Sequence, residues 1–232
     1  MFGLHNEPIM RYDNKGRLVY YNDGFLEWYK EYNEFDLLIS FIRNDGYKEF
    51  YEYNILGLPI YYKNSNGEYW FIHYNDLGLK SYYKDHTGLE QWYEYDNQGR
   101  VIHFKDSTGY EYMDNYDNNG NLIYHTDSNG AKTVWVYDEN NRLIHYRDAV
   151  SGYDKSNIYD DRGNLIELID SNNEHISYTY NENNQLIHII SHSWYYEEWR
   201  DYDDEGRIIY IRDSDGFEKV YEYDENGILI KD

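Results

Sequence analysis

One pattern dominates the sequence, recurring every 20 to 22 residues along the chain. Each copy is anchored on a Tyr that is followed by Asp or Asn. The anchors are Tyr12, Tyr32, Tyr53, Tyr74, Tyr95, Tyr116, Tyr137, Tyr159, Tyr180, Tyr202 and Tyr223. A period this regular is typical of repeat proteins, in which each copy buries apolar surface by stacking on its neighbours. We therefore expect about ten repeats rather than a conventional globular core.

Each repeat carries two turn signals, mostly of the form Asp-x-x-Gly, such as Asp96–Gly99 and Asp106–Gly109. A leading Asp or Asn can cap a turn through its side chain, and the fourth position often needs a positive φ, which Gly adopts without steric cost. The pattern predicts a type I turn closed by a left-handed residue. The Gly of the first turn is replaced by residues that tolerate this geometry: Asp36, Asn141 and Asn184.

The segments between the turns are six or seven residues long and rich in aliphatic and aromatic residues, which predicts strands. The fold class is therefore all-β: tandem hairpin repeats of about 21 residues form one continuous, curled antiparallel meander. Adjacent residues such as Leu122 and Ile123 point to opposite faces, so both faces carry apolar side chains. We expect residues 1–11 to form an N-terminal cap and residues 12–232 to form a single array.

The chain is strongly acidic, with 44 Asp and Glu against 21 Lys and Arg and a formal net charge of -23. One residue in five is aromatic, at 20%, which argues against disorder. This charge argues against direct binding to nucleic acid or to a membrane surface. The chain has no Cys, and its first residues resemble neither a secretion signal nor a membrane span. We therefore expect a cytoplasmic protein, in the host cytoplasm if a phage encodes it.

The clearest copies of the pattern are YDNKGRLV at 12–19, YDNQGRVI at 95–102 and YDDEGRII at 202–209. These motifs resemble the YD-repeat, or Rhs-repeat, family, and the resemblance covers residues 12–230. It implies a long β-strip, which in large members of that family spirals into a hollow shell around toxin cargo. This chain is short and shows no shell-closing protease segment or toxin domain. We therefore expect a short stand-alone member that forms a strip rather than a closed shell.

No catalytic motif is present, so we expect neither an enzyme nor a cofactor. Runs such as 94–99 resemble the start of a calcium loop, but Lys105 stands where that loop needs a bidentate Glu. Plain turn chemistry is the preferred interpretation, and no metal site is predicted.

A ladder of polar and aromatic residues lies eight residues after most anchors. It could stabilise the sheet across strands, which we favour, or bind sugars or a protein. Its members are Tyr61, Tyr82, His103, Tyr124, His145, Glu167, His188 and Tyr210.

The turn aspartates should line both long edges of the strip, and the irregular turn near residue 192 adds aromatic residues. Both sets are candidates for contact with a basic partner. The candidates are Asp96, Asp106, Asp117, Asp127, Asp138, Asp148, Asp160, Asp170, Asp203, Asp213, His192, Trp194, Tyr195 and Tyr196.

The preferred hypothesis is a non-catalytic intracellular protein that binds a basic protein target. It would act as an inhibitor or immunity factor, of phage or mobile-element origin, that blocks a nucleic-acid enzyme or toxin, with DNA mimicry as one route. Two alternatives stay open: a carbohydrate- or cell-wall-binding module, and a structural relative of an Rhs shell. The final strand edge also leaves open a homodimer formed through the sheet edge.

Overall fold

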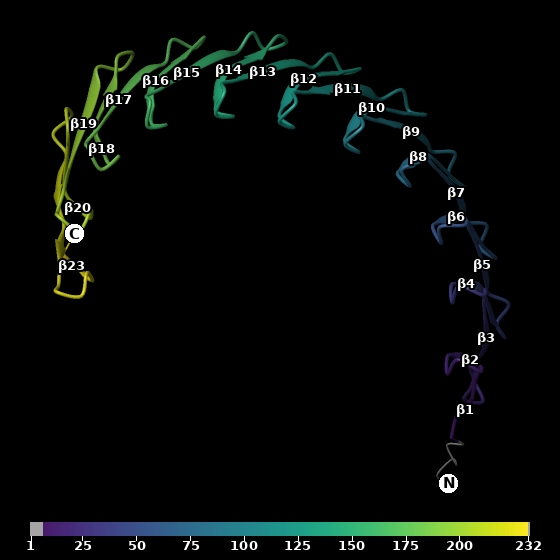
Figure 1. Cartoon of the computed structure of the whole chain (residues 1–232). Coiled ribbons are helices and arrows are strands. Elements are labelled where there is room, and N and C mark those ends of the chain that lie inside the picture. Colours follow the sequence, from purple (N-terminus) through teal and green to yellow (C-terminus); the bar gives the residue numbers. More distant parts are fainter. Residues whose placement is uncertain (1–6, 232) are drawn as a thin grey trace. The chain divides into compact units, whose positions relative to one another are not determined.

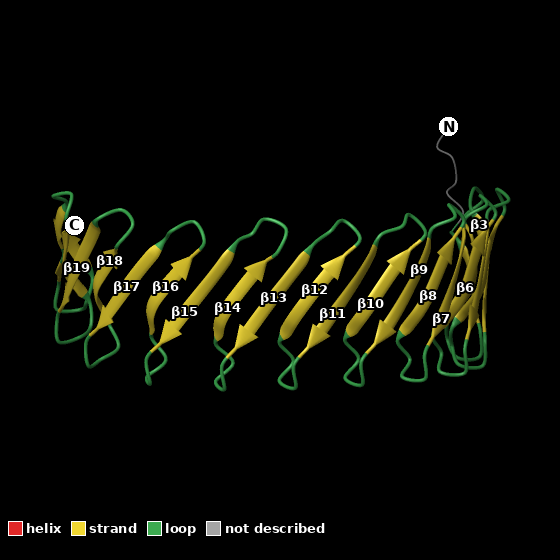
Figure 2. Ribbon diagram, turned by 90° about the horizontal axis from the view of Figure 1, so that it is seen from above, coloured by secondary structure: helices red, strands yellow, loops and turns green. Residues whose placement is uncertain are grey.

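The computed structural model describes residues 7–231, and all their regular elements are β-strands joined by short loops (Figure 2). The chain divides into two compact units, Met1–Met113 and Asp114–Asp232, and the division falls inside strand β11 (Glu111–Tyr116). The all-β prediction is confirmed.

The N-terminal unit is a meander in which each strand pairs with the next one in the chain, always antiparallel (Figure 1). Its strands are β1 (Ile9–Tyr12), β2 (Leu18–Asn22), β3 (Glu27–Tyr32), β4 (Leu38–Arg43), β5 (Lys48–Tyr53), β6 (Pro59–Asn64), β7 (Tyr69–Tyr74), β8 (Lys80–Asp85), β9 (Glu90–Tyr95), β10 (Val101–Asp106) and the start of β11. The last residues of the expected N-terminal cap, from Ile9, already form β1; residues 1–6 lie outside the described part.

The C-terminal unit repeats the same arrangement and ends in a separate two-stranded pair, β22–β23. Its strands are β12 (Leu122–Asp127), β13 (Lys132–Tyr137), β14 (Leu143–Asp148), β15 (Asp154–Tyr159), β16 (Leu165–Asp170), β17 (His175–Tyr180), β18 (Leu186–Ser191), β19 (Tyr196–Tyr202), β20 (Ile208–Asp213), β21 (Glu218–Val220), β22 (Glu222–Tyr223) and β23 (Leu229–Lys231). Within each unit the sheet bends gradually along the strand order (Figure 1).

The first turn of each repeat has the predicted geometry. In the turn at Asp96, the Gly99 N–H donates to the Asp96 carbonyl at 3.1 Å, and Gly99 has a φ of +81°. The prediction for the replaced glycines is also confirmed, because Asp36, Asn141 and Asn184 have φ values of 66°, 61° and 61°. Each unit thus has a first-turn edge and, at the other strand ends, a second-turn edge (Figure 2).

Strand pairing differs between the two kinds of neighbour. The hairpin β7–β8, closed by a first turn, pairs five residues on each strand and ends at Tyr74 and Lys80. The pair β8–β9, joined by a second turn, has only three residue pairs and ends at Tyr82 and Trp92. Backbone pairing therefore joins successive hairpins only at the second-turn edge. At the first-turn edge, side chains must join them.

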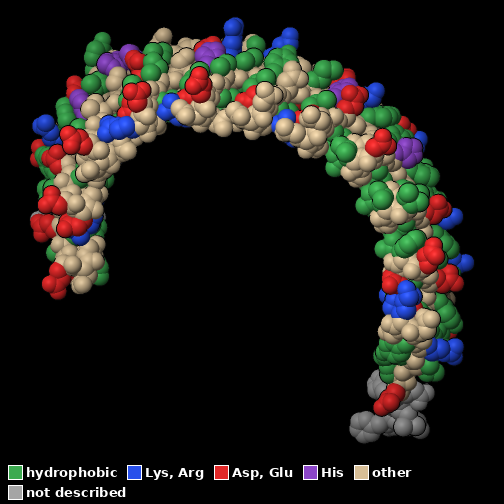
Figure 3. Space-filling view, viewed as in Figure 1, with side chains coloured by type: hydrophobic (Ala, Val, Ile, Leu, Met, Phe, Trp, Pro, Cys, Tyr) green, Lys and Arg blue, Asp and Glu red, His purple; other side chains and the backbone are tan. Residues whose placement is uncertain are grey.

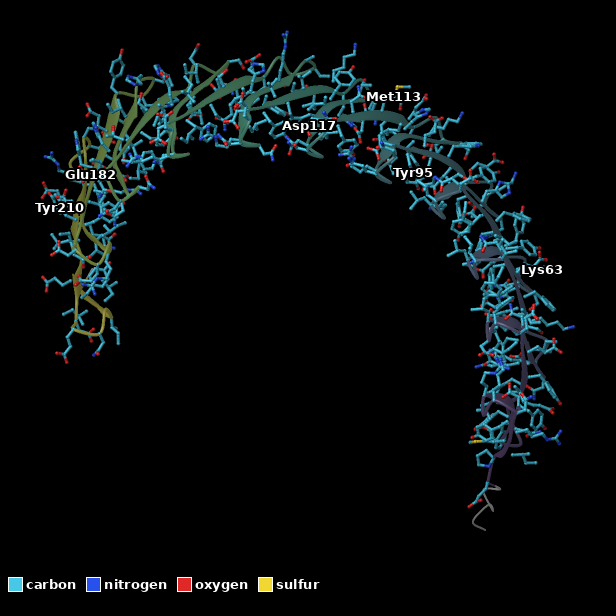
Figure 4. The ribbon with its side chains drawn as sticks, in the orientation of Figure 1. Lys63, Tyr95, Met113, Asp117, Glu182 and Tyr210 are labelled. Atoms are coloured by element: carbon cyan, nitrogen blue, oxygen red, sulfur yellow. The ribbon has the colours of Figure 1, made fainter. Side chains whose placement is uncertain are left out.

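The sheet has almost no enclosed core. Among the described residues, Tyr20 is the only buried hydrophobic residue, at 8% exposed. Half-buried aromatic pairs across the strands take its place, such as the rings of Tyr51 and Tyr62, whose centroids lie 5.0 Å apart. Figure 4 shows Lys63 and Met113 on one side of the N-terminal unit and Tyr95 on the other. Both faces therefore carry large side chains, as the paired apolar residues of the sequence predict.

Candidate partner-binding site

The first-turn candidates are aspartates that open their turns: Asp96, Asp117, Asp138, Asp160 and Asp203. At Asp138, one carboxylate oxygen accepts the backbone N–H groups of Asn140 and Arg142, each at 2.9 Å. The other oxygen accepts the Arg142 Nε–H at 2.6 Å. The Arg142 backbone N–H is the largest influence that holds the Asp138 pKa below its usual value. This carboxylate stabilises its own turn.

The residue four positions after the opener changes together with the opener. An opening Asp is followed there by Arg or Asn in six of seven repeats, with Ile228 after Asp224 as the exception. An opening Asn is followed by Leu, or once by Gln. A charged opening Asp is therefore usually accompanied by a side chain that can donate a hydrogen bond to its carboxylate. Arg142 also covers the next anchor, with its guanidinium 4.8 Å from the Tyr159 ring centroid. This coupling was visible in the sequence but was missed there.

The second-turn candidates lie on the opposite edge of each unit: Asp106, Asp127, Asp148, Asp170 and Asp213. At Asp106, the carboxylate accepts the Thr108 hydroxyl at 2.5 Å and the Thr108 N–H at 2.8 Å. The hydroxyl bond is the first cause of a lowered Asp106 pKa. The structure therefore places the ten candidate aspartates in two separate rows, each engaged with its own turn.

Other carboxylates are more open to a partner than the turn aspartates. The side chains of Glu94 and Glu205 are 70% and 66% exposed, whereas that of Asp138 is 19% exposed. Sequence reasoning did not propose these glutamates as partner-binding residues, because periodicity alone does not separate a capping carboxylate from an exposed one. Glu94 pairs with His103 and Glu205 with Arg207, and both stay largely exposed.

The turn that joins β18 to β19 presents two aromatic side chains to solvent. Trp194 is 78% exposed and Tyr195 is 90% exposed. Tyr195 has a φ of +54°, although Gly152 holds the matching place two repeats earlier. A positive φ is rare for a bulky residue and costs free energy. Trp194 and Tyr195 therefore form an exposed pair on a strained turn.

The other two candidates in this turn contact side chains of the sheet, although His192 stays exposed and only Tyr196 is half-buried. The His192 ring centroid lies 4.2 Å from that of His175. The Tyr196 hydroxyl lies 3.2 Å from a Glu198 carboxylate oxygen, and the pKa of Tyr196 is raised to about 12, first by burial and then by Glu198. These contacts with neighbouring side chains distinguish His192 and Tyr196 from Trp194 and Tyr195.

The polar and aromatic ladder is engaged across the strands. Tyr61 stacks on Phe71 at 4.7 Å between ring centroids, and His188 stacks on Trp199 at 5.0 Å. His103 Nε2 lies 2.6 Å from Glu111 Oε1. These contacts favour the stabilising role. Within residues 7–231 no group of three or more His, Asp or Glu is arranged to hold a metal ion. The same residues contain no helix that could cross a membrane.

Solved structures share this fold. They include the crystal structures of TcdB2-TccC3-TEV (TM-score 0.53, 16% identity), TcdB2-TccC3-Cdc42 (0.51, 13%) and TcdB2-TccC3 without its hypervariable C-terminal region (0.51, 14%). Each match covers 96% of this chain but only 14% to 16% of the other chain. At these identities the likeness concerns the fold alone. No curated protein matches the sequence significantly.

Turns capped by their own openers, recurring along antiparallel hairpins, define a tandem β-hairpin repeat protein. Within this class, residues 116–151 and 159–191 match the family model described as RHS Repeat. The repeats in these two ranges are RHS repeats, which confirms the resemblance drawn from the Tyr-Asp motifs.

Proposed function

We propose that this chain is a non-catalytic protein-binding scaffold whose partner is a basic protein. The observation that carries the proposal is the excess of carboxylates, 44 against 21 basic residues, with side chains such as Glu94 and Glu205 largely exposed. A surface with this charge attracts basic proteins over a distance and accelerates their association.

The exposed pair Trp194 and Tyr195 is the proposed anchor of this interaction. Large aromatic side chains are enriched among the residues that dominate binding energy. Backbone strain also tends to accumulate at functional sites, and Tyr195 has a φ of +54° where Gly would be unstrained. Charge would then bring the partner in, and the aromatic pair would hold it.

The specific form of this proposal is an inhibitor or immunity factor that blocks a nucleic-acid enzyme or a toxin. Charge spacing favours simple blocking over DNA mimicry. Equivalent turns recur every second strand, or about 10 Å, whereas phosphates recur about every 3.4 Å along one DNA strand. The turn aspartates also face their own turns, as Asp138 does. These aspartates contribute to the negative electrostatic potential of the surface more than to direct contacts with a partner.

The test is affinity capture from a nuclease-treated bacterial lysate, with elution by a salt gradient and mass spectrometry. The variants are Trp194→Ser/Tyr195→Gly and, as a matched control, Phe25→Ser, because Phe25 is an 87% exposed aromatic on another second turn. We expect a basic protein that elutes at raised salt, is lost with the double variant and is kept with the control. Recovery of the bait alone contradicts the proposal, and equal capture by all three proteins contradicts the anchor role of Trp194 and Tyr195.

Carbohydrate binding is the second candidate. A shallow hollow on the N-terminal unit is lined by Tyr61, Phe71, His73 and Tyr74 among others, and Phe71 is 39% exposed. Aromatic rings of this kind can stack on sugars. A glycan array that binds the wild type but not Phe71→Ala would favour this candidate. A third role, as part of a larger Rhs shell, is supported only by the fold likeness.

A further inference from the structure

An apolar stripe interrupts the polar first-turn edge of the N-terminal unit. It consists of Phe35, Ile55, Leu56 and Leu77, which are 66%, 95%, 69% and 64% exposed, and we refer to it as the turn-edge stripe. Phe35, Leu56 and Leu77 occupy the third residue of three consecutive first turns. The other repeats hold polar residues at that position: Lys15, Gln98, Asn119, Asn140, Arg162, Asn183, Glu205 and Asn226.

The turn-edge stripe is continuous because successive first turns contact each other through a second set of leucines. Leu37 Cδ1 lies 3.5 Å from the position that a β-carbon would take on Gly57, and Leu58 Cδ1 lies 3.7 Å from that position on Gly78. Figure 3 shows hydrophobic side chains gathered over the loops of the hairpins β3–β4, β5–β6 and β7–β8. The exposed side chains therefore sit on one joined apolar surface.

The same three repeats have also lost the charge of their turn openers. They begin with Asn33, Asn54 and Asn75 instead of Asp. The amide oxygen keeps the turn intact, since Asn33 Oδ1 accepts the N–H groups of Phe35 and Leu37, each at 3.0 Å. The three turns with an exposed apolar residue thus lack the opening carboxylate. Because burying a charge is costly, this replacement suits a surface that a partner covers.

We propose that the turn-edge stripe binds a basic amphipathic helix of a partner protein. The turn N–H groups are already bonded to their openers, so they offer no free row for an added strand. A helix satisfies its own backbone and presents only side chains. Two strands advance about 10 Å per repeat, and seven helical residues advance about 10.5 Å. An apolar residue at every seventh position of a helix would meet Phe35, Leu56 and Leu77 in turn.

Charge at the two ends of the turn-edge stripe defines the flanks of this helix. Glu34 and Asp76 are exposed and adjoin Phe35 and Leu77. They lie two repeats apart, so Lys or Arg residues about fourteen positions apart on the helix would face them. This inference rests on the proposed function in assuming a protein partner. It goes further by naming the surface and the element that binds there.

The test uses a fluorescent helical peptide of about 21 residues, with Leu at every seventh position and Lys at the flanks. A control peptide has the same composition with the Leu spacing broken. The stripe variant is Phe35→Asn/Leu56→Gln/Leu77→Asn, which introduces residues that other repeats hold there. The matched control variant is Gln98→Asn/Asn119→Gln/Asn140→Gln. Circular dichroism establishes that each variant folds, and Leu56→Gln alone replaces the triple variant if that one does not.

Fluorescence anisotropy should show the spaced peptide binding the wild type more than about tenfold more tightly than the control peptide. The stripe variant should lose this preference, and the control variant should keep it. Equal affinity for both peptides, or an unchanged stripe variant, overturns the proposal. Two further results would overturn the proposal by showing a different occupant of the stripe. The wild type could bind phosphatidylcholine vesicles, or it could self-associate in the ultracentrifuge, and in either case the stripe variant would abolish that binding. If a lysate protein is captured equally by wild type and stripe variant, the stripe proposal fails while the proposed function stands.

Discussion

The hydroxyl of Tyr95 donates a hydrogen bond of 2.7 Å to the backbone carbonyl of Lys80, which begins the preceding strand. This bond lies at the first-turn edge, where the pairing between β8 and β9 has already ended. The same kind of hydrogen bond recurs in other repeats, through the anchors Tyr53, Tyr74, Tyr159, Tyr202 and Tyr223. The anchor tyrosine is therefore a side-chain substitute for strand pairing between neighbouring repeats.

Removal of this hydroxyl should weaken the array without changing its outline. We expect Tyr95→Phe to lower the free energy of unfolding by about 1 kcal/mol, the usual net contribution of one intramolecular hydrogen bond. Urea unfolding measures it. Tyr195→Phe, at a 90% exposed position, is the control and should change almost nothing. Equal effects of the two substitutions would show that the anchor hydroxyl does not join the repeats.

The coupling between turn opener and fourth following residue can be tested by exchange of one pair type for the other. Arg142→Leu leaves the Asp138 carboxylate without its Nε–H donor and should lower the melting temperature. The double variant Asp138→Asn/Arg142→Leu recreates the Asn–Leu pair that stands at Asn54 and Leu58, and should recover most of the loss. Purely additive effects in thermal melts would contradict this coupling.

The positive φ of Tyr195 should lower the stability of the fold, while its side chain serves binding. Tyr195→Gly relieves a positive φ of 54° and should raise the free energy of unfolding by about 1 kcal/mol. Gly152→Ala, at a φ of +74°, should lower it by a similar amount, about 1 kcal/mol. Chemical denaturation measures both changes. A destabilised Tyr195→Gly protein would mean that the Tyr195 side chain holds the turn together and that its role is not reserved for a partner.

The His103 cluster should make stability fall as pH rises. A hydrogen bond to Glu111, followed by the influence of Glu94, raises the pKa of His103 above its usual value. The protonated ring therefore stabilises the fold fully below the unfolded pKa of about 6.5, and this contribution is lost as pH rises through the higher folded pKa. The urea concentration at the unfolding midpoint should therefore decrease as the pH is raised from about 5.5 to about 8.5. His103→Gln should reduce that fall; a variant with the same profile as the wild type would rule the cluster out.

Local turn chemistry made much of the fold predictable. A capped turn is decided within about five residues, so the left-handed positions of Asn141 and Asn184 followed from the sequence alone. The Tyr95–Lys80 bond did not follow, because it joins residues 15 apart through strands that diverge at one edge. The candidate site was only partly predictable for the same reason. Periodicity placed Asp138 on an edge but could not show that its own turn occupies it.

The central claim is that this acidic array binds a basic protein, and salt tests it most directly. The measurement is the dissociation constant of the captured partner, determined by isothermal titration calorimetry between about 0.05 M and about 0.5 M salt, a range over which exposed charges become screened. We predict that affinity falls by more than about tenfold as salt rises, as expected for association between opposite charges. An affinity that stays constant across this range would contradict the claim.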